Sequence, residues 1–225
     1  MPHTIALVGG TGPEGRGLAT RFALAGHRVA IGSREAARGV DAARELAERL
    51  AGHGVAADHV TGGDNAQAVA DADIVLVVVP YAAHRATLEG LRGALDGRIV
   101  VDAVVPVVFD RGPRPVDVPA GSATEEAAEI LPASRVIGAF HNLAAEVLLD
   151  PDASVDADVL VTGGDAQAKQ TVMALAAEIA GVTAVDAGPL RFSRFVEGLT
   201  ILLIGINGRY KAHTGVRIAG LSDHQ

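Results

Sequence analysis

The residues whose types and spacing most clearly indicate chemistry lie in a glycine-rich turn near the start of the chain. The pattern G-x-G-x-x-G runs over residues 10–15, directly after an apolar, strand-like run and before a helix-like segment. In that context it indicates dinucleotide binding, because the start of the helix presents free N–H groups to the phosphates. The first glycine permits a tight turn, the second lets the backbone approach a pyrophosphate, and the third allows close helix packing. The expected contacts are Gly10, Thr11, Gly12, Pro13 and Glu14.

The end of the second expected strand indicates which dinucleotide binds. An NAD site usually carries Asp or Glu there, about 20 residues beyond the first glycine, to bind the ribose 2′-hydroxyl. This chain carries Ser33 and Arg34 instead, and Arg38 follows one helical turn later. These side chains suit a 2′-phosphate, because arginine forms charge-assisted, bidentate contacts with phosphate. The pattern predicts NADP(H) as the cofactor. The alternative is that Arg34 and Arg38 only form the solvated start of a helix.

The elements that must position these residues alternate along most of the chain, which predicts a parallel sheet with helices on both faces. Ile74–Val79 is wholly apolar and largely β-branched, as expected for a central strand buried on both sides. The other expected strands are 3–8, 28–31, 57–61, 98–104, 135–140, 159–161 and 183–186. The expected helices are 14–25, 35–51, a short one capped by Asp64, 81–95, 124–131 and 165–180. The predicted fold class is α/β: a Rossmann-like, doubly wound, mostly parallel sheet with a C-terminal helical segment.

Two segments depart from this alternation. Residues 105–122 contain four prolines, and we expect a long ordered loop there. Residues 194–206 are apolar almost all round a helix, and such a helix is normally buried. We expect residues 1–188 to form the NADP-binding domain and residues 189–225 to complete the second-substrate site. The apolar helix predicts a homodimer, with burial inside its own monomer as the alternative.

The composition excludes several classes of function. The chain has 225 residues, a formal net charge of −8 and no cysteine. Its length allows burial of roughly 70% of the surface of the unfolded chain. The negative charge disfavours binding to nucleic acid or to an anionic membrane, and the lack of cysteine excludes disulfides and thiolate nucleophiles. The first strand begins close to Met1 and no apolar run is long enough to span a bilayer, so we expect a cytoplasmic protein.

Six short motifs, spread over nearly the whole chain, resemble one family. They are Leu7–Gly15, Gly32–Arg34, Val79–Tyr81, Phe140–Asn142, Asp186–Leu190 and Val196–Thr200. Together they are similar to the NADPH-dependent reductases of the deazaflavin coenzyme F420. The resemblance implies hydride transfer between the nicotinamide C4 and the deazaflavin C5, with the two rings stacked at the carboxyl edge of the sheet. It implies NADP(H) as the cofactor and coenzyme F420 as the co-substrate.

The resemblance also assigns roles by position. Thr11, Gly12, Ser33, Arg34 and Arg38 match residues around the pyrophosphate and the 2′-phosphate. Further matches line the nucleotide (Val79, Pro80, Tyr81), the nicotinamide (Val104, Val105, Pro106), the ring stack (His141, Ala145) and the deazaflavin pocket (Gly188, Pro189, Leu190). The chain departs from the family pattern at Arg191-Phe192 and at Thr200-Ile201, and Phe192 can stack or obstruct near the deazaflavin.

The sequence carries no motif of a catalytic triad, a zinc protease or a phosphate-binding lysine loop. Hydride transfer needs little acid–base help, because it depends on holding the donor and acceptor carbons in contact. His141 is the catalytic candidate, as a hydrogen-bond donor to the charge that develops on the deazaflavin, with a structural role as the alternative. We expect His84 and His27 at the surface, with a contact to the cofactor as the alternative for His84. Tyr81 packs either on the nucleotide or in the core.

Charge gives a separate indication about the second ligand. Residues 189–218 contain five basic side chains and one acidic side chain in a chain that is acidic as a whole. Coenzyme F420 carries a phosphodiester and a glutamate tail, and a basic collar would attract both. The alternative is that these side chains cover an interface or pair with acids elsewhere.

Three functions stay open on the sequence alone. The first is an oxidoreductase that transfers hydride between NADP(H) and coenzyme F420. The second is an NADPH-dependent reductase of another small carbonyl or imine at the same NADP site. The third is a nucleotide sensor without catalytic activity.

Overall fold

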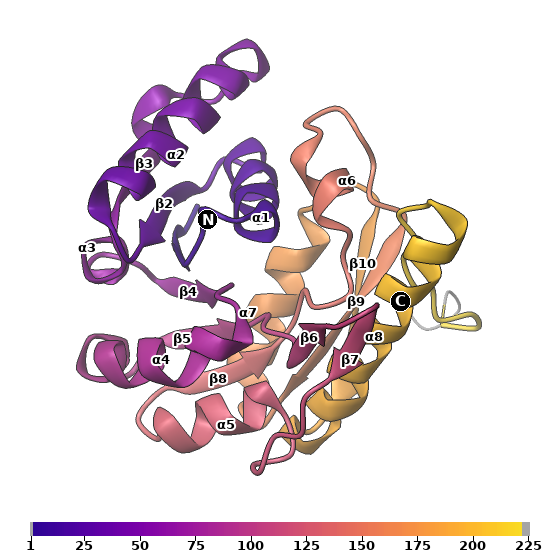
Figure 1. Cartoon of the computed structure of the whole chain (residues 1–225). Helices are drawn as coiled ribbons and strands as arrows, with labels where there is room; N and C mark the ends of the chain where they lie inside the picture. The colour runs from indigo at the N-terminus through magenta and orange to yellow at the C-terminus, as the bar shows by residue number, and fades with distance from the viewer. Residues whose placement is uncertain (1, 222–225) are drawn as a thin grey trace.

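Eight strands form the central sheet in the order β10-β9-β8-β5-β4-β1-β2-β3, in a computed structural model that describes residues 2–221 (Figure 1). The strands of this sheet are β1 (Thr4–Val8), β2 (Arg28–Ser33), β3 (Val60–Asp64), β4 (Ile74–Val77), β5 (Ile99–Asp102), β8 (Arg135–Gly138), β9 (Ala157–Gly163) and β10 (Val182–Gly188). The helices are α1 (Pro13–Leu24), α2 (Ala36–Leu50), α3 (Asn65–Val69), α4 (Tyr81–Leu95), α5 (Ala123–Ile130), α6 (Ala145–Leu149), α7 (Ala166–Ala177) and α8 (Ser193–Tyr210).

The sheet is parallel from β3 across to β8, and the pairing of β8 with β9 is antiparallel. Because β9 and β10 pair in parallel with each other, both run opposite to the other six strands. The predicted fold class, a mostly parallel Rossmann-like sheet with a C-terminal helix, is therefore confirmed.

Both faces of the sheet are buried, which leaves its strand ends as the place for a ligand. Alternate residues of β1 enter opposite cores: Ile5 and Leu7 pack with Phe22 of α1, whereas Val8 packs in the same cluster as Leu88 of α4. This is the alternation expected of a strand covered by helices on both sides. In such sheets ligands bind outside the carboxyl ends of the strands, where the strand order reverses. Here that point lies between β1 and β4.

Several elements follow the expected bounds and others differ. The helix expected at residues 81–95 is α4, and Asp64 caps α3 by accepting the Gln67 N–H at 2.8 Å. The third strand begins later than expected, because a 3₁₀ turn, η2 (Ala57–His59), takes up its expected start. The expected loop at 105–122 contains a hairpin, β6 (Val107–Phe109) with β7 (Pro113–Pro115), and this hairpin packs on α8.

The prediction that His27 and His84 lie at the surface is wrong, because both side chains are buried. His27 is held at both ring nitrogens: Nε2 lies 2.7 Å from the Glu178 carboxylate, and Nδ1 accepts the His3 N–H at 2.9 Å. His84 is enclosed by acidic partners that are described with the site below. A histidine that follows a helix-ending glycine or lies on an amphipathic helix resembles a surface residue until its distant partners are known.

The C-terminal helix is buried on one side only. Val196 and Leu203 of α8 are buried, whereas Phe195 is 67% exposed and Leu202 is 59% exposed on the single chain. Among the helices of residues 2–221, none combines the length and the apolar character needed to cross a bilayer.

Candidate active site

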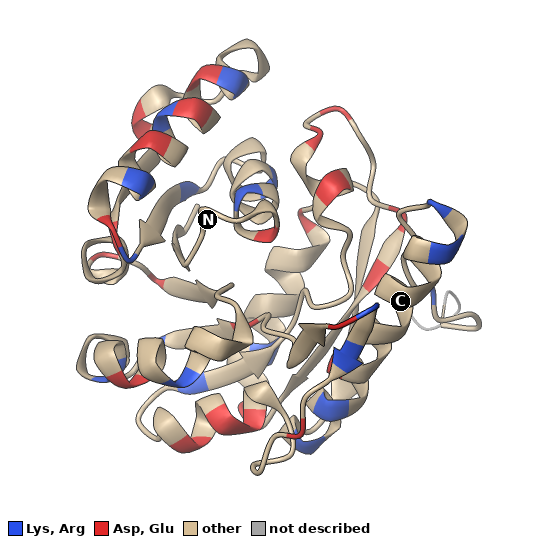
Figure 2. Ribbon diagram, in the orientation of Figure 1, with Lys and Arg blue, Asp and Glu red and all other residues tan. Residues whose placement is uncertain are grey.

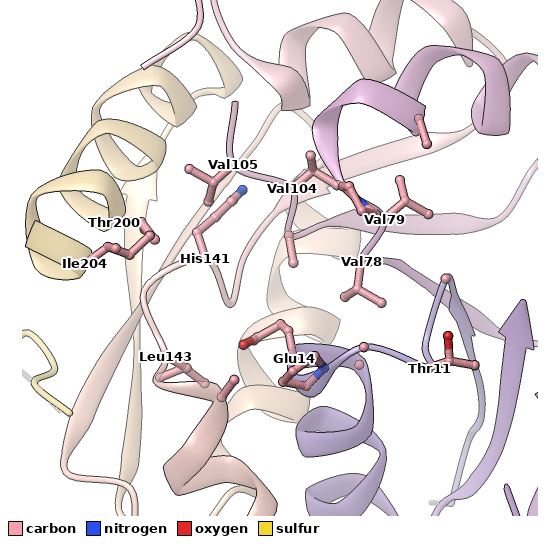
Figure 3. A pocket seen from close by; sticks show the side chains of 18 of the residues that line it. Thr11, Glu14, Val78, Val79, Val104, Val105, His141, Leu143, Thr200 and Ile204 are labelled. Carbon is pink, nitrogen blue, oxygen red and sulfur yellow. The ribbon is translucent and has the colours of Figure 1, made fainter. Parts of the chain in front are cut away.

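A cleft of about 850 Å³ opens at the carboxyl ends of the parallel strands. Its wall is formed by the turns that follow β1, β4, β5 and β8, by the start of α6 and by the second half of α8 (Figure 3). Sequence segments from residue 9 to residue 214 thus meet in a single hollow. This is the position at which an open α/β sheet binds a nucleotide.

The glycine-rich turn forms the floor of the cleft. The Gly10 N–H donates to the carbonyl oxygens of Leu7 at 3.1 Å and Gly32 at 2.9 Å, which ties the turn to both flanking strands. A Cβ on Gly15 would lie 2.5 Å from the Gly10 Cα, so only glycine allows α1 to start this close to the turn. The α1 N-terminus begins with a proline and lacks a capping side chain. Its free N–H groups and dipole therefore face the cleft, as an anion site requires.

The end of the cleft at which β2 finishes carries the predicted basic pair. Ser33 is the buried last residue of β2, and Arg34 and Arg38 follow it with exposed side chains on the cleft wall. Neither guanidinium forms an ion pair within residues 2–221. This end of the cleft can therefore accept a doubly charged phosphate without breaking an internal contact.

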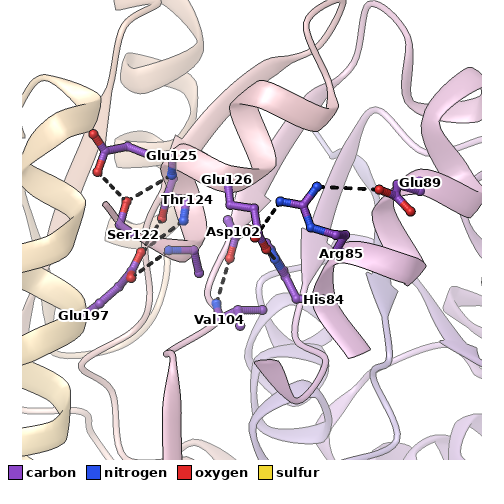
Figure 4. Close-up of polar contacts among 11 residues, drawn as sticks. His84, Arg85, Glu89, Asp102, Val104, Ser122, Thr124, Glu125, Glu126 and Glu197 are labelled. Atoms are coloured by element: carbon purple, nitrogen blue, oxygen red, sulfur yellow. Dashed lines mark hydrogen bonds and ion pairs between the residues drawn. The ribbon is translucent and has the colours of Figure 1, made fainter. Parts of the chain in front are cut away.

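A buried ionic network supports the middle wall (Figure 4). Asp102 ends β5 and accepts the Val104 N–H at 2.9 Å, which holds the turn that lines the cleft. The other oxygen of Asp102 lies 2.6 Å from His84 Nε2, and His84 Nδ1 lies 2.9 Å from Glu126. Arg85 completes the network at 2.9 Å from Glu126. Burial lowers the pKa of His84, but the carboxylates of Asp102 and Glu126 outweigh burial and raise that pKa to about 9.

His141 stands in the cleft with both ring nitrogens unsatisfied. Its side chain is buried, and neither Nδ1 nor Nε2 has a hydrogen-bond partner among the described residues. Burial lowers the pKa of His141 to about 4, against a smaller opposing effect of Asp102, so the ring is neutral near pH 7. Phe140 just before it adopts a φ of 67°, a left-handed conformation that is unfavourable for a bulky residue. Strained backbone and unsatisfied nitrogens together are features of a ligand site.

Glu14, the second residue of α1, also points into the cleft (Figure 3). The residue as a whole is half-buried, but its Oε1 is inaccessible to solvent and has no hydrogen-bond partner among the described residues. Burial raises the pKa of Glu14 to about 8, and the nearby Glu146 carboxylate adds to that rise.

Helix α8 closes the opposite wall. Thr200, Leu203, Ile204 and Asn207 line the cleft from its middle and its second half. The first half is anchored by Glu197, which caps α5 by accepting the N–H groups of Ala123 at 2.9 Å and Thr124 at 3.1 Å. Burial raises the pKa of Glu197 to about 7, and these hydrogen bonds oppose that rise. The α8 wall is thereby tied to the same helix that holds the His84 network.

Most of the predicted site residues meet on this cleft. They are Thr11, Gly12, Pro13, Glu14, Ser33, Arg34, Arg38, Val79, Pro80, Val104, Val105, His141 and Ala145. The Gly10 N–H is directed at the carbonyl oxygens of Leu7 and Gly32, and Tyr81 is stacked on His84 with 6.0 Å between ring centroids. The residues predicted to line the cleft that are not on its wall are Gly10, Tyr81, Pro106, Gly188, Pro189 and Leu190.

The strand reversal explains the position of Gly188–Leu190. Because β10 runs opposite to the central strands, the chain that leaves Gly188 heads away from the cleft. It turns through η3 (Leu190–Phe192) and returns as α8, with Ser193 Oγ 2.6 Å from Thr162 Oγ1. Phe192 is likewise absent from the cleft wall, and its ring packs edge-on to Phe195 at 6.0 Å. The role of Gly188–Leu190 in a deazaflavin pocket stays a prediction.

Other lining residues were not predicted from the sequence. Asn65 supports the phosphate turn, since its side-chain oxygen accepts the Gly9 N–H at 3.1 Å. The sequence feature that could have indicated this role is the position of Asn65 directly after Asp64, the residue that caps α3. The remaining ones that belong to the far wall are Leu143, Ala144, Glu146, Leu203, Ile204, Asn207 and Thr214. They come from α6 and the turn before it, and from α8 and the segment after it. The cleft-facing side of α8 cannot be identified from an almost uniformly apolar sequence.

The residues present fit a phosphorylated dinucleotide and a second ring. Two guanidinium groups that have no ion pair within residues 2–221 and a buried hydroxyl stand at one end of the cleft. The start of α1 with Glu14 lies further along, and His141, whose ring nitrogens lack partners among the same residues, stands beyond it (Figure 3). Apolar side chains of Val78, Val79 and Val104 lie between them. Sites for flat cofactors combine such apolar walls with a few polar groups that fix orientation.

Comparison with known proteins points to one family. The family model described as "NADP oxidoreductase coenzyme F420-dependent" matches residues 4–106. The F420-dependent NADP reductase of Methanocaldococcus jannaschii is 41% identical over 96% of this chain and 98% of its own length. That of Methanothermobacter marburgensis is 39% identical over 97% and 99%. A crystal structure assigned to an F420-dependent NADP reductase from Arthrobacter sp. FB24 superposes with a TM-score of 0.81 at 28% identity, covering 96% of this chain and 99% of that one.

Proposed function

The chain belongs to the family of coenzyme F420-dependent NADP oxidoreductases, and we propose that its cleft holds NADP(H) and coenzyme F420 side by side while hydride passes between them. The protein is an oxidoreductase with NADP(H) as cofactor and F420 as co-substrate. The proposed placement of the two coenzymes rests on one observation. A single cleft runs from the Ser33–Arg34 pair, past the start of α1, to His141, whose ring nitrogens have no hydrogen-bond partner among residues 2–221.

The NADP(H) half of the cleft would be held by charge and by backbone. Arg34 and Arg38 would pair with the 2′-phosphate, and the Ser33 hydroxyl would face the same group. The α1 N-terminus at Gly12 and Pro13 would bind the pyrophosphate. These groups fix one end of the cofactor, so that the nicotinamide lies beyond the turn of β5, near Val104.

The part of the cleft that would hold the two coenzyme rings aligns them and supplies no reacting group of its own. When both are bound, the two coenzymes supply the hydride donor and acceptor. The protein holds the two rings in position and excludes water. In such a reaction these two effects account for most of the lowering of the activation barrier that a protein can provide. His141 would donate a hydrogen bond from its neutral ring to a carbonyl or ring nitrogen of the stack. The valines of the middle wall would press the stack against α8.

The tail of coenzyme F420 would leave the cleft at the C-terminal end of α8. Arg209 and Lys211 lie there, directly after the cleft-lining Asn207 (Figure 2). Two other basic residues of this segment already have partners: Arg194 pairs with Glu125 at 3.1 Å, and Arg217 pairs with Asp158 at 2.8 Å. The expected basic collar is therefore narrower than the sequence indicates, and Arg209 and Lys211 are its best candidates for an anionic tail.

We further propose a homodimer that forms through the outer face of α8. Phe195 and Leu202 are exposed on this face, and Phe109 of the adjoining hairpin is 71% exposed. Exposed apolar side chains on neighbouring elements are typical of an interface. The division at residue 188, the cytoplasmic location and the lack of nucleic-acid partners stay predictions from the sequence.

Simultaneous binding tests the proposed arrangement. NADP⁺ and oxidised F420 cannot react with each other, so calorimetry can measure their binding together. We expect F420 to bind the NADP⁺-saturated protein at a stoichiometry of one per chain. Mutual exclusion of the two coenzymes would contradict the arrangement.

A further inference from the structure

Glu14 is the one acidic side chain of the phosphate turn, and its position needs an explanation. Its Oε1 is buried without a hydrogen-bond partner among residues 2–221, although the residue lies on the wall of a large cleft. Polar atoms in this state are uncommon, because desolvation without a partner is costly. A carboxylate beside a pyrophosphate site is also unfavourable for electrostatic reasons. A role toward the ligand would account for both features.

The carboxyl group faces the ring end of the cleft rather than the adenosine end. In Figure 3 it points toward the side of His141 and Leu143 and away from Thr11. A dinucleotide that runs from Arg34 past the start of α1 places its nicotinamide on the side to which the carboxyl group points. Glu14 therefore stands where the pyrophosphate gives way to the nicotinamide ribose and ring.

The charges around Glu14 favour its protonated form while the cleft is without a cation. Burial raises its pKa to about 8, and Glu146 of α6 adds to the effect. His141 is neutral above about pH 4 and brings no positive charge. The guanidinium groups of Arg34 and Arg38 lie at the far end of the cleft, with exposed side chains.

We propose that Glu14 discriminates between the oxidised and the reduced nicotinamide through its own charge. This inference rests on the proposed NADP(H) site. NADP⁺ and NADPH share the pyrophosphate and the 2′-phosphate, and they differ by the positive charge of the oxidised ring. An ionised Glu14 attracts that ring, whereas a protonated Glu14 does not. Binding of NADP⁺ therefore promotes release of the Glu14 proton to solvent, and NADPH leaves the proton in place.

The consequence is a preference that depends on pH. As pH rises through about 8, Glu14 ionises and NADP⁺ gains affinity relative to NADPH. One pair of unit charges at close range in a partly solvated site corresponds to about a tenfold change in the ratio of the two dissociation constants. The 2′-phosphate also titrates, but it is common to both coenzymes and cancels in the ratio.

Calorimetric titration of the full chain with NADP⁺ and with NADPH, from pH 6 to pH 9, tests the proposal. Buffers of different ionisation enthalpy report the number of protons released on binding. We expect proton release with NADP⁺ that exceeds the release with NADPH, and a ratio of dissociation constants that shifts about tenfold toward NADP⁺ across this range. Glu14→Gln keeps the size and polarity of the side chain but cannot ionise, so its ratio should not vary with pH.

Glu146→Gln is the matched control, because it removes an exposed carboxylate at the same cleft. It should keep the shift in ratio and move its midpoint to lower pH, since Glu146 contributes to the raised pKa of Glu14. A ratio that does not vary with pH in the unmodified chain, or an unchanged shift in Glu14→Gln, would overturn the inference while leaving the NADP(H) site intact. Failure of the unmodified chain to bind either coenzyme would instead overturn the proposed function.

Discussion

At the scale of single residues, we expect the choice of coenzyme to depend on Arg34. Replacement of Arg34 by Glu removes a charged contact to the 2′-phosphate and adds repulsion, so NADPH should bind on the order of 30- to 1000-fold more weakly. NADH lacks that phosphate and should be affected far less. Titration of both coenzymes measures the difference. Arg44→Glu changes an arginine of α2, the helix that follows Arg34, away from the cleft wall, and it should leave both affinities nearly unchanged. Equal weakening of NADPH and NADH in Arg34→Glu would disprove the assignment.

His141 gives a second prediction at this scale. Because burial keeps its pKa near 4, the ring is a neutral donor throughout the physiological range, and its ionisation should not affect the rate between pH 6 and pH 8. His141→Ala should lower the rate of hydride transfer by about 100-fold, as is typical when an aligned donor is lost. His141→Asn keeps a donor and should recover part of the rate. Single-turnover kinetics separate this effect from coenzyme binding. A rate in His141→Ala equal to that of the unmodified chain would leave His141 with a structural role.

At the scale of elements, the His84 network should make stability depend on pH. The pKa of His84 is about 9 in the folded chain against 6.5 for the free side chain, so the folded state binds more protons between these values. The free energy of unfolding should therefore fall as pH rises from 6.5 to 9, by up to about 3 kcal/mol. Denaturant titrations across this range measure the fall. His84→Gln should make the fall smaller and remove it between pH 8 and pH 9, which is above the raised pKa values of Glu14 and Glu197. His59→Gln, a half-buried histidine of η2, is the control. If the fall between pH 8 and pH 9 persists in His84→Gln, a group other than His84 causes it.

The elements also show what a sequence can predict. The phosphate turn and Ser33–Arg34 were predictable, because their contacts are local and set by glycine spacing and by one strand end. The buried states of His84 and His27 were not, since their partners Glu126 and Glu178 lie 42 and 151 residues away. The face of α8 that lines the cleft was hidden by an apolar sequence on all sides. The reversed direction of β9 and β10 was also not predicted, because the composition of a strand does not indicate its direction. This reversal places Gly188–Leu190 away from the cleft wall.

At the scale of the whole molecule, the outer face of α8 should hold two chains together. Leu202→Glu places a charge on an exposed apolar position and should convert a dimer into monomers, as measured by sedimentation or light scattering. Val40→Glu, which changes an exposed valine on α2, should leave the dimer intact. A monomeric unmodified chain at micromolar concentration would contradict the proposed interface.

The task that we propose for the whole cleft is to bring two flat redox carriers into contact. Its walls come from both ends of the chain, and its polar groups are arranged to orient rather than to exchange protons with a substrate. This favours direct transfer between coenzymes over reduction of a small carbonyl or imine, in agreement with the relatives described above. It also means that neither coenzyme alone should show net chemistry on the protein.

The most direct test is to mix the purified chain with NADP⁺ and F420 that is reduced and deuterated at C5, and to follow absorbance and mass. We expect NADPH to appear as reduced F420 is consumed in equal amount, with deuterium at the nicotinamide C4. NADPH without deuterium, or no NADPH at all while the chain reduces a carbonyl or imine with NADPH, would contradict the account.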